Sequence, residues 1–305
     1  MKKKIVIQIP CLNEETTIGK VVTQLKRNLP SSKIMVYDNL SDDKSAENAK
    51  NSGAEVVLEK KKGKGNVVKR MFSDPIDADI YVMVDGDDTY DTSKISDSIR
   101  LMTEGNFDML VGYRKHSNPS AYRPGHVFGN KFFSSFVHMI FGNDIRDIFS
   151  GYRFFSKRFV KTFPQNSNEF EIEAELTIHA LEQGFKVGEF ECVYKPRPEG
   201  SSSKLSTYKD GIKILKLILI LIKDEKPLLF FSILSLIFMF FSLLIGIPII
   251  KDFYISGLVE KLPSAILAGL LSVISFLSFF CGLILDVMKK IRFENKRMNY
   301  LLFKD

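Results

Sequence analysis

The sequence predicts an α/β domain followed by a two-helix membrane hairpin, and three observations support this fold class. Short β-branched runs alternate with helical patterns up to about residue 200, which is typical of a mostly parallel sheet with helices on both faces. Two later runs, 228–250 and 264–285, contain no charged side chain and are each long enough to cross a bilayer. Polar residues follow every predicted strand, so a ligand site is expected at the carboxyl edge of the sheet.

The individual elements follow from the same patterns. Strands are expected at 4–9, 33–38, 54–59, 79–85 and 107–112. Helices are expected at 14–28 and 42–52, because Asn13 and Ser41 stand near their starts as capping residues. The aromatic segment 125–141 fits either a core helix or a helix on the membrane surface.

The charge distribution indicates a membrane protein with its large domain in the cytosol. The net charge of +7 comes largely from basic clusters, two of which flank the apolar runs. Basic residues beside a span are explained by topology and anionic lipid, so no nucleic-acid partner is expected. One side of the hairpin carries most of them: Lys223, Lys226, Lys289, Lys290, Arg292, Lys296 and Arg297, against Lys251 and Lys261 in the loop. Both termini are therefore predicted to be cytosolic, at the cell membrane or an endoplasmic-reticulum equivalent.

These features predict four segments. They are a cytosolic domain at 1–205, an amphipathic juxtamembrane helix at 206–226, a hairpin at 227–288 with spans near 228–250 and 264–286, and a basic tail at 289–305. Three widely spaced cysteines without metal-ligand spacing fit a reduced cytosolic domain.

The acidic segment VMVDGDDTYD at 82–91 is the strongest single motif. A buried type of strand runs directly into clustered carboxylates, and Asp85 and Asp87 are one residue apart on a turn where Gly86 lets the backbone bend. Two such carboxylates can hold a hard divalent cation, Mg²⁺ or Mn²⁺, that also bridges a diphosphate. The alternative is an acidic cap in front of a helix at 92–103.

Four segments together resemble the metal-dependent GT-A core of family 2 glycosyltransferases: IPCLNEE after the first strand, IMVYDNLSDD at the second, KGKGN at 62–66 and DGDD at 85–88. The resemblance implies a mixed nucleotide-sugar-binding sheet. It implies nucleotide contacts from Pro10, Leu12, Asn13, Glu14, Asp38, Lys64, Asp85 and Gly86, with the metal on Asp85 and Asp87. Many members read DDGS where this chain has Asp38 to Ser41, so the ribose contact departs from the family pattern.

Three later segments resemble the branch of that family that includes dolichyl-phosphate mannose and glucose synthases. They are DIFSGYRFFS at 147–156, FEIEAEL at 170–176 and the stretch from YKPRPEG to KDG at 194–211. The resemblance implies a polyprenyl phosphate acceptor bound by Arg114, Arg123, Arg197 and Lys204. It also implies catalytic roles for Asp85, Asp87, Arg114 and Arg153, and places Ser150, Gly151, Glu171 and Glu173 near the sugar.

The chemistry of that acceptor agrees with the residues present. A lipid phosphate oxygen is already anionic near neutral pH, so attack on the anomeric carbon needs cations rather than a general base. Opposite-face attack on an α-linked donor gives inversion and a β-linked product. UDP-glucose or UDP-N-acetylglucosamine is the favoured donor and GDP-mannose the alternative, whereas the lipid, undecaprenyl or dolichyl, and homo-oligomer formation stay open.

Three other classes of protein fit the sequence less well. A processive polysaccharide synthase carries a Gln-x-x-Arg-Trp motif, and this chain has no tryptophan. A non-catalytic membrane scaffold would have little reason to gather unpaired carboxylates, which are costly without a ligand. A nucleotidyltransferase would need no membrane spans.

Overall fold

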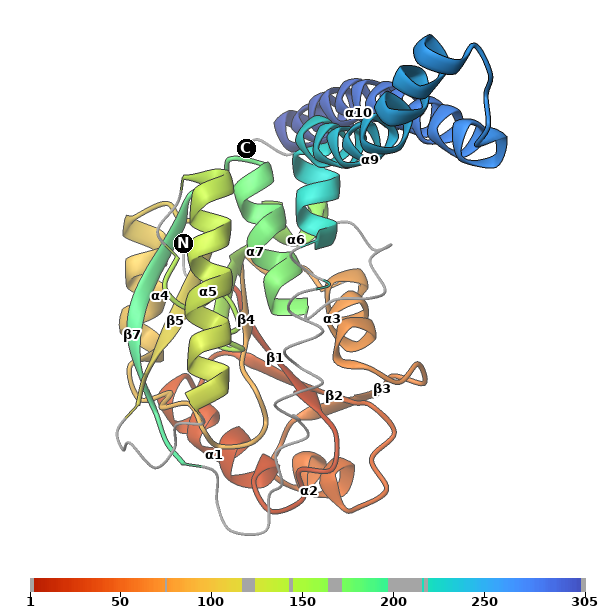
Figure 1. Ribbon diagram of the computed structural model, residues 1–305. Helices are drawn as coiled ribbons and strands as arrows, with labels where there is room; N and C mark the ends of the chain where they lie inside the picture. The colour runs from red at the N-terminus through yellow and green to blue at the C-terminus, as the bar shows by residue number, and fades with distance from the viewer. Residues whose placement is uncertain are drawn as a thin grey trace. The chain divides into compact units, whose positions relative to one another are not determined.

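The computed structural model describes residues 3–74, 76–116, 124–142, 145–163, 172–196, 216 and 219–302 (Figure 1). The chain divides into two compact units. The first consists of Met1–Ile214 together with Lys296–Asp305, and the second is Leu215–Asn295. The first unit is built around a β-sheet, and the second is a pair of long helices.

Among the described residues of the first unit, seven strands form one mixed sheet in the order β3-β2-β1-β4-β6-β5-β7. The pairs β1–β2, β1–β4, β2–β3 and β5–β7 are parallel, whereas β6 runs antiparallel to both of its neighbours, β4 and β5. The strands are β1 Ile5–Cys11, β2 Lys33–Asp38, β3 Glu55–Leu58, β4 Ile80–Met83, β5 Met109–His116, β6 Arg153–Ser156 and β7 Val187–Tyr194.

Helices cover both faces of this sheet and bury a separate core on each (Figure 1). One core contains side chains of α1 Ile18–Asn28, α2 Ser45–Asn51 and α4 Ile95–Glu104. The other contains side chains of α3 Lys64–Ser73, α6 Lys157–Thr162 and α7 Ile172–Glu182. Successive residues of β1 point to opposite faces, so Val6 enters one core and Ile7 the other.

The predicted fold class is confirmed, with two strands added. The five expected strands are all present, and β2 has the expected bounds. Strand β6 inserts antiparallel between β4 and β5, which are distant from it in the chain, and a local sequence pattern does not reveal such a pairing. Helix α1 begins at Ile18 rather than at residue 14, because the backbone before it is bonded to a neighbouring loop.

The aromatic segment 125–141 forms most of helix α5 Pro124–Phe141. Phe133 and Val137 are buried, and the Phe133 ring lies 5.4 Å from that of Phe149, while Met139 is exposed. The described part of α5 therefore packs one side into the α/β unit, as expected of a core helix.

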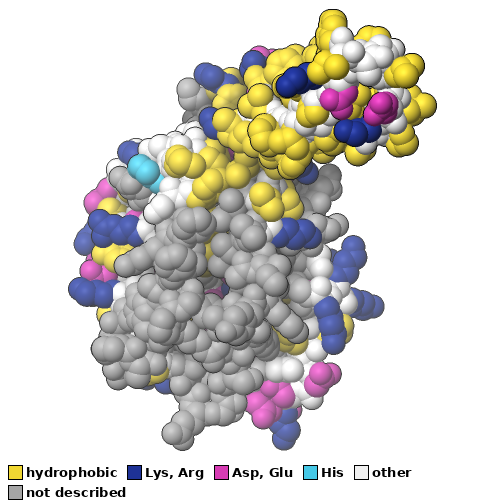
Figure 2. All heavy atoms as spheres, in the orientation of Figure 1, with side chains coloured by type: hydrophobic (Ala, Val, Ile, Leu, Met, Phe, Trp, Pro, Cys, Tyr) yellow, Lys and Arg dark blue, Asp and Glu magenta, His cyan; other side chains and the backbone are white. Residues whose placement is uncertain are grey.

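The second unit contains α9 Pro227–Ser256 and the greater part of α10 Leu262–Leu302, which enclose the two predicted spans. Both helices are long and apolar enough to cross a membrane. Serines join them: the Ser242 hydroxyl lies 2.7 Å from that of Ser272, and Ser235 lies 3.0 Å from Ser275. Large apolar side chains cover the outside of the hairpin (Figure 2). The predicted juxtamembrane helix at 206–226 lies largely outside the described residues.

A buried carboxylate ties the two helical segments of this unit together at the end opposite the 257–261 loop. Glu225 is almost fully buried and lies 3.2 Å from the Lys289 ammonium and 2.9 Å from the Arg292 guanidinium. Some of the basic residues that predict the cytosolic side thus also have a structural partner.

Candidate active site

The loops that follow β1, β2 and β3 form a continuous rim, residues 11–15, 38–45 and 59–64, called here the β1–β3 rim. The Asn13 amide N–H donates to the Ser41 hydroxyl at 2.9 Å, and the Asn13 side-chain oxygen accepts from the Asp42 N–H at 2.9 Å. The Glu14 N–H donates to the Ser45 hydroxyl at 2.7 Å. The loop that carries the predicted nucleotide residues Asn13 and Glu14 is therefore bonded to the segment that follows Asp38, as the parallel pairing of β1 and β2 allows.

Asn39, where the family pattern often has an aspartate, connects this rim to the loop after β3. Its side-chain amide donates to the carbonyls of Glu59 and Lys61 at 3.0 and 2.7 Å, and its oxygen accepts from the Gly63 N–H at 2.7 Å. A carboxylate could accept the third bond but could not donate the other two. In the sequence this position is only a departure from the family pattern, whereas in the structure Asn39 positions the loop after β3.

Asp38 at the end of β2 is buried and incompletely bonded. Its Oδ2 accepts from the Ser41 N–H at 3.2 Å, whereas Oδ1 has no hydrogen-bond partner among the described residues. A buried carboxylate oxygen without a donor is costly, so a ligand donor is the natural partner. Pro10 lies beside Tyr37 in the sheet, and Leu12 follows at the start of the rim.

The acidic carboxylates follow β4, and Gly86 and Asp87 lie in a turn, as the sequence predicts. The left-handed backbone conformation is at Asp88, which has φ of 57°. Gly86 also lies close to α1, because a Cβ there would be 3.1 Å from the Ile18 side chain. Asp87 is buried and its Oδ1 accepts from the Thr89 N–H and hydroxyl, at 3.2 and 2.6 Å. Asp88 is paired with Lys20.

Asp85 lies against Lys64, at the start of α3, and through it meets a carboxylate from α7. The Lys64 ammonium is 2.6 Å from Asp85 Oδ1 and 2.5 Å from Glu173 Oε1. Partial desolvation would lower the pKa of Lys64, but the two carboxylates outweigh it and hold that pKa well above its usual value. The structure thus brings together three residues that the sequence analysis assigned to nucleotide, metal and sugar.

Gly151 supports Asp85 from the other side. A Cβ on Gly151 would lie only 2.2 Å from Asp85 Oδ2, so this carboxylate occupies the space a side chain would need. The Gly151 N–H donates to the buried Tyr90 hydroxyl at 2.8 Å. The expected sugar-side residue Gly151 is therefore a close backbone support for Asp85.

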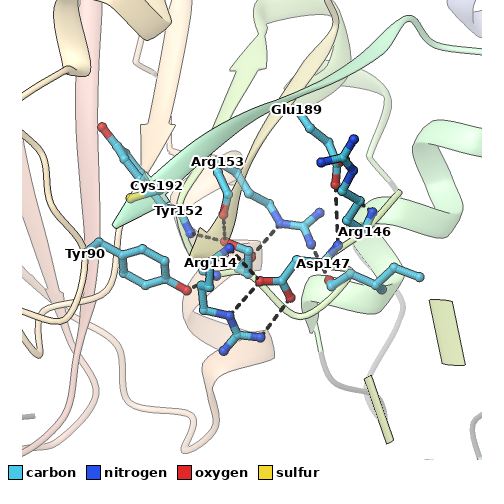
Figure 3. Close-up of polar contacts among 12 residues, drawn as sticks. Tyr90, Arg114, Arg146, Asp147, Tyr152, Arg153, Glu189 and Cys192 are labelled. Carbon is cyan, nitrogen blue, oxygen red and sulfur yellow. Dashed lines mark hydrogen bonds and ion pairs between the residues drawn. The ribbon is translucent and has the colours of Figure 1, made fainter. Parts of the chain in front are cut away.

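Arg114 on β5 is held by Asp147 in a two-pronged ion pair (Figure 3). Arg114 Nε and Nη2 lie 2.7 and 2.8 Å from the two carboxylate oxygens of Asp147, and the Arg114 guanidinium also lies over the Tyr194 ring at 5.4 Å. The Arg114 side chain is 22% exposed, so it is oriented by Asp147 and still reachable by a ligand.

Arg153 lies in the same cluster but cannot reach a ligand in this arrangement, which corrects the expectation of a direct catalytic contact. Its side chain is fully buried and donates to the carbonyls of Ser150 and Ile148, at 2.8 and 2.5 Å, and to the Thr177 hydroxyl at 2.8 Å. Burial lowers the pKa of Arg153 to about 10. Arg153 therefore positions the loop before β6.

The expected sugar contact of Ser150 is also corrected. Its side chain is fully buried, and its hydroxyl donates to the Gly112 carbonyl at 2.6 Å instead of facing a sugar. The residues of this second region are called here the β5–β6 cluster: Arg114, Asp147, Ser150, Gly151 and Arg153. Tyr90, Asp147 and Thr177 were missed from the sequence, although Asp147 opens the quoted segment DIFSGYRFFS.

Four expected site residues, Arg123, Glu171, Arg197 and Lys204, lie outside the described residues. Within the described ranges no group of three or more His, Cys, Asp or Glu side chains is arranged to hold a metal ion. Two carboxylates, those of Asp85 and Asp87, lie in the loop after β4, and the Lys64 ammonium already lies beside the first. Such a donor set fits a divalent ion that takes its other ligands from a diphosphate and water.

Comparison with known proteins gives the family. The model described as Glycosyl transferase family 2 matches residues 6–163 of the 305-residue chain. The chain belongs to glycosyl transferase family 2. It is therefore a glycosyltransferase, and the match spans the β1–β3 rim and the acidic motif.

Two relatives from Haloferax volcanii extend the likeness beyond that match. The chain is 32% identical to glycosyltransferase AglJ over 227 residues, which cover 74% of each protein. It is 26% identical to a dolichyl-phosphate hexose transferase over 214 residues, which cover 70% of this chain and 92% of that protein.

Among solved structures, glucosyl-3-phosphoglycerate synthase from Mycobacterium tuberculosis, crystallised with Mn²⁺, UDP and glucosyl-3-phosphoglycerate, has a TM-score of 0.55 and 18% identity. The match covers 72% of this chain and 79% of that one, and it shows that the two share a fold.

Proposed function

We propose that this glycosyltransferase moves a sugar from a nucleoside diphosphate sugar to a polyprenyl phosphate at a membrane surface, with inversion at the anomeric carbon. The observation that carries the proposal is the joining, in one chain, of a family 2 site to a hairpin of two helices apolar enough to cross a membrane. The likeness to a dolichyl-phosphate hexose transferase supports the same acceptor class. UDP-glucose and UDP-N-acetylglucosamine are the favoured donors, and GDP-mannose is the alternative.

The β1–β3 rim is the donor side of this proposal. The free oxygen of Asp38 offers an acceptor for a nucleoside donor group, and the rim backbone is already organised by Asn13 and Asn39. Asp85 and Asp87 would hold Mg²⁺ or Mn²⁺. When bound there, the metal would stabilise the charge on the departing diphosphate.

The β5–β6 cluster is the acceptor side. Arg114 is oriented by Asp147 and remains reachable, and an arginine fork matches a phosphate group. Because that phosphate is already anionic, the site needs to orient it and does not need to remove a proton. Arg123, Arg197 and Lys204 remain predicted phosphate ligands, and Glu171 a predicted sugar contact.

The hairpin would place this reaction at the cytosolic face. Lys289, Arg292 and Lys296 lie beyond one end of the apolar segment of α10, while Lys251 and Lys261 lie near the other. The excess of basic residues favours the first end as the cytosolic one. A lipid-embedded acceptor would then present its phosphate on the same side as the α/β unit.

The test uses the full-length protein in detergent with Mn²⁺, a short-chain polyprenyl phosphate and each of the three radiolabelled donors in turn. The proposal expects label in the lipid phase and release of nucleoside diphosphate with one donor, and neither with Asp85→Asn. Release of pyrophosphate would indicate a nucleotidyltransferase instead. The absence of turnover with every donor would contradict the proposal and favour a scaffold.

A further inference from the structure

Lys64 links two carboxylates that come from different parts of the fold. Asp85 lies in the loop after β4, Glu173 belongs to the first turn of α7, and Lys64 is the first residue of α3. Glu173 is almost fully buried, with 6% of its surface exposed, so it needs a cation beside it. Lys64 supplies that cation at 2.5 Å and reaches Asp85 at 2.6 Å.

The position of Lys64 is not explained by helix stability. A helix N-terminus carries a partial positive charge, so a lysine in its first turn is unfavourable there. The residue before it, Gly63, has φ of 119° and accepts no ordinary side chain without strain, and its N–H is held by Asn39. The local structure thus fixes a lysine where the helix itself gains nothing from it, beside a proposed metal ligand.

A divalent ion on Asp85 would meet the Lys64 ammonium at close range. Two cations beside one carboxylate repel each other strongly in a partly desolvated site. A nucleoside diphosphate changes this balance, because its negative oxygens give the ammonium a new partner next to the metal. Glu173 cannot lose its cation so easily, because it is buried more deeply than Asp85, whose side chain is 24% exposed.

We infer that Lys64 is an exchangeable counter-ion of the site. In the absence of substrate its ammonium neutralises both Asp85 and Glu173. When the metal and the nucleoside diphosphate bind, Lys64 gives up Asp85 to the metal, keeps Glu173, and turns to the diphosphate. Glu173 is then a positioning residue for Lys64, and the metal binds tightly only together with the nucleotide. This inference rests on the proposed function through the metal site at Asp85.

The test measures Mn²⁺ affinity of the full-length protein in detergent by the loss of the free Mn²⁺ EPR signal, without nucleotide and with UDP or GDP, corrected for Mn²⁺ bound by free nucleotide. In the wild type we expect one nucleotide to strengthen Mn²⁺ binding by about tenfold or more, a common size for coupling between two ligands. In Lys64→Met we expect Mn²⁺ alone to bind more tightly than in the wild type and the nucleotide effect to shrink. Lys50→Met, which removes an exposed lysine of α2 outside the rim, should match the wild type.

Lys64→Gln is the second variant, because its uncharged amide can still donate to a carboxylate if Lys64→Met fails to fold. The inference is overturned if these variants bind Mn²⁺ alone no more tightly than the wild type does. It is also overturned if neither nucleotide changes the Mn²⁺ affinity of the wild type. Sugar transfer measured on the same preparation separates the two claims: transfer without coupling overturns only the exchange, whereas loss of both contradicts the proposed function too.

Discussion

The β1–β3 rim and the β5–β6 cluster differ in how far their charged side chains already have partners within the protein. In the rim, side chains such as Asn13 and Asn39 bond to backbone groups of neighbouring loops, and the Asp38 carboxylate keeps one oxygen without a partner among the described residues. In the cluster, Arg114 is already paired with Asp147 and Arg153 with backbone carbonyls. The rim is therefore organised around an open acceptor, whereas a ligand of the cluster must share cations that already have partners.

The largest effect should come from the acidic motif that lies between these regions. Asp85→Asn and Asp87→Asn are each expected to lower kcat roughly a hundredfold to a thousandfold, as when one major electrostatic contact is removed from a site. The measurement is sugar transfer at saturating Mn²⁺ and donor. Asp91→Asn, which changes the last carboxylate of the same motif, is the control and should retain most activity. Full activity of Asp87→Asn would show that the metal assignment is wrong.

The two arginines of the cluster should separate by stability. Arg153→Lys loses several donations to buried acceptors and is expected to lower the free energy of unfolding by about 2–4 kcal/mol. Arg114→Lys keeps a positive charge beside Asp147 and loses fewer bonds, so it should lower that free energy by less than Arg153→Lys and raise the KM for polyprenyl phosphate. Thermal melting and acceptor titration of both variants make the comparison. Equal stability losses would contradict the distinction between a positioning and a ligand-facing arginine.

These two residues also show what a sequence can and cannot reveal about this site. Arg153 lies in the family segment DIFSGYRFFS, Arg114 follows the predicted strand at 107–112, and the strand from Lys33 to Asp38 follows from its apolar run. The burial of the two arginine side chains does not follow from the sequence. It depends on β6 inserting antiparallel between β4 and β5, which joins residues distant in the chain. The contact of Gly151 with Asp85 has the same origin. Local patterns identify the loops that carry the chemistry, and packing decides which side chains face a ligand.

Gly151→Ala tests the link between the cluster and the acidic motif. The added carbon would displace the Asp85 carboxylate, and Mn²⁺ affinity in the presence of nucleotide is expected to fall roughly tenfold to a hundredfold, as for other supports of metal ligands. Gly269→Ala is the matched control, because no side chain and no other segment lies within 4 Å of its added carbon. Unchanged Mn²⁺ binding by Gly151→Ala would separate the two regions.

Helix α7 joins a site residue, Glu173, to a core residue, His179, which lies among the rings of Phe159, Phe163 and Phe185. Burial lowers the pKa of His179 from 6.5 to about 3. Below pH 6.5 the histidine of the unfolded chain therefore binds a proton, whereas the buried histidine of the folded chain stays neutral. The free energy of unfolding consequently falls as the pH drops from 6.5 towards 3. Between pH 6.5 and 5 the loss is about 2 kcal/mol. Melting midpoints over this range should fall less steeply for His179→Gln, and parallel curves would contradict this reading.

Asn39→Asp should have the smallest effect of the series, confined to the rim. It keeps the size of the side chain but loses both donations to the carbonyls of Glu59 and Lys61. We expect the KM for the donor to rise about tenfold, the equivalent of one or two hydrogen bonds, with the KM for the acceptor unchanged. A change in the KM for the acceptor alone would show that the loop after β3 belongs to the acceptor side and would contradict its assignment to the donor side.

The central claim is that the acceptor is an anionic lipid phosphate and that the site contributes cations and no base. The most direct measurement compares a short-chain polyprenyl phosphate with the polyprenyl alcohol of the same length, under one donor and Mn²⁺ concentration, by the sugar label recovered in the lipid phase. The account predicts labelled lipid from the phosphate and none above background from the alcohol. Equal transfer to the alcohol would contradict it.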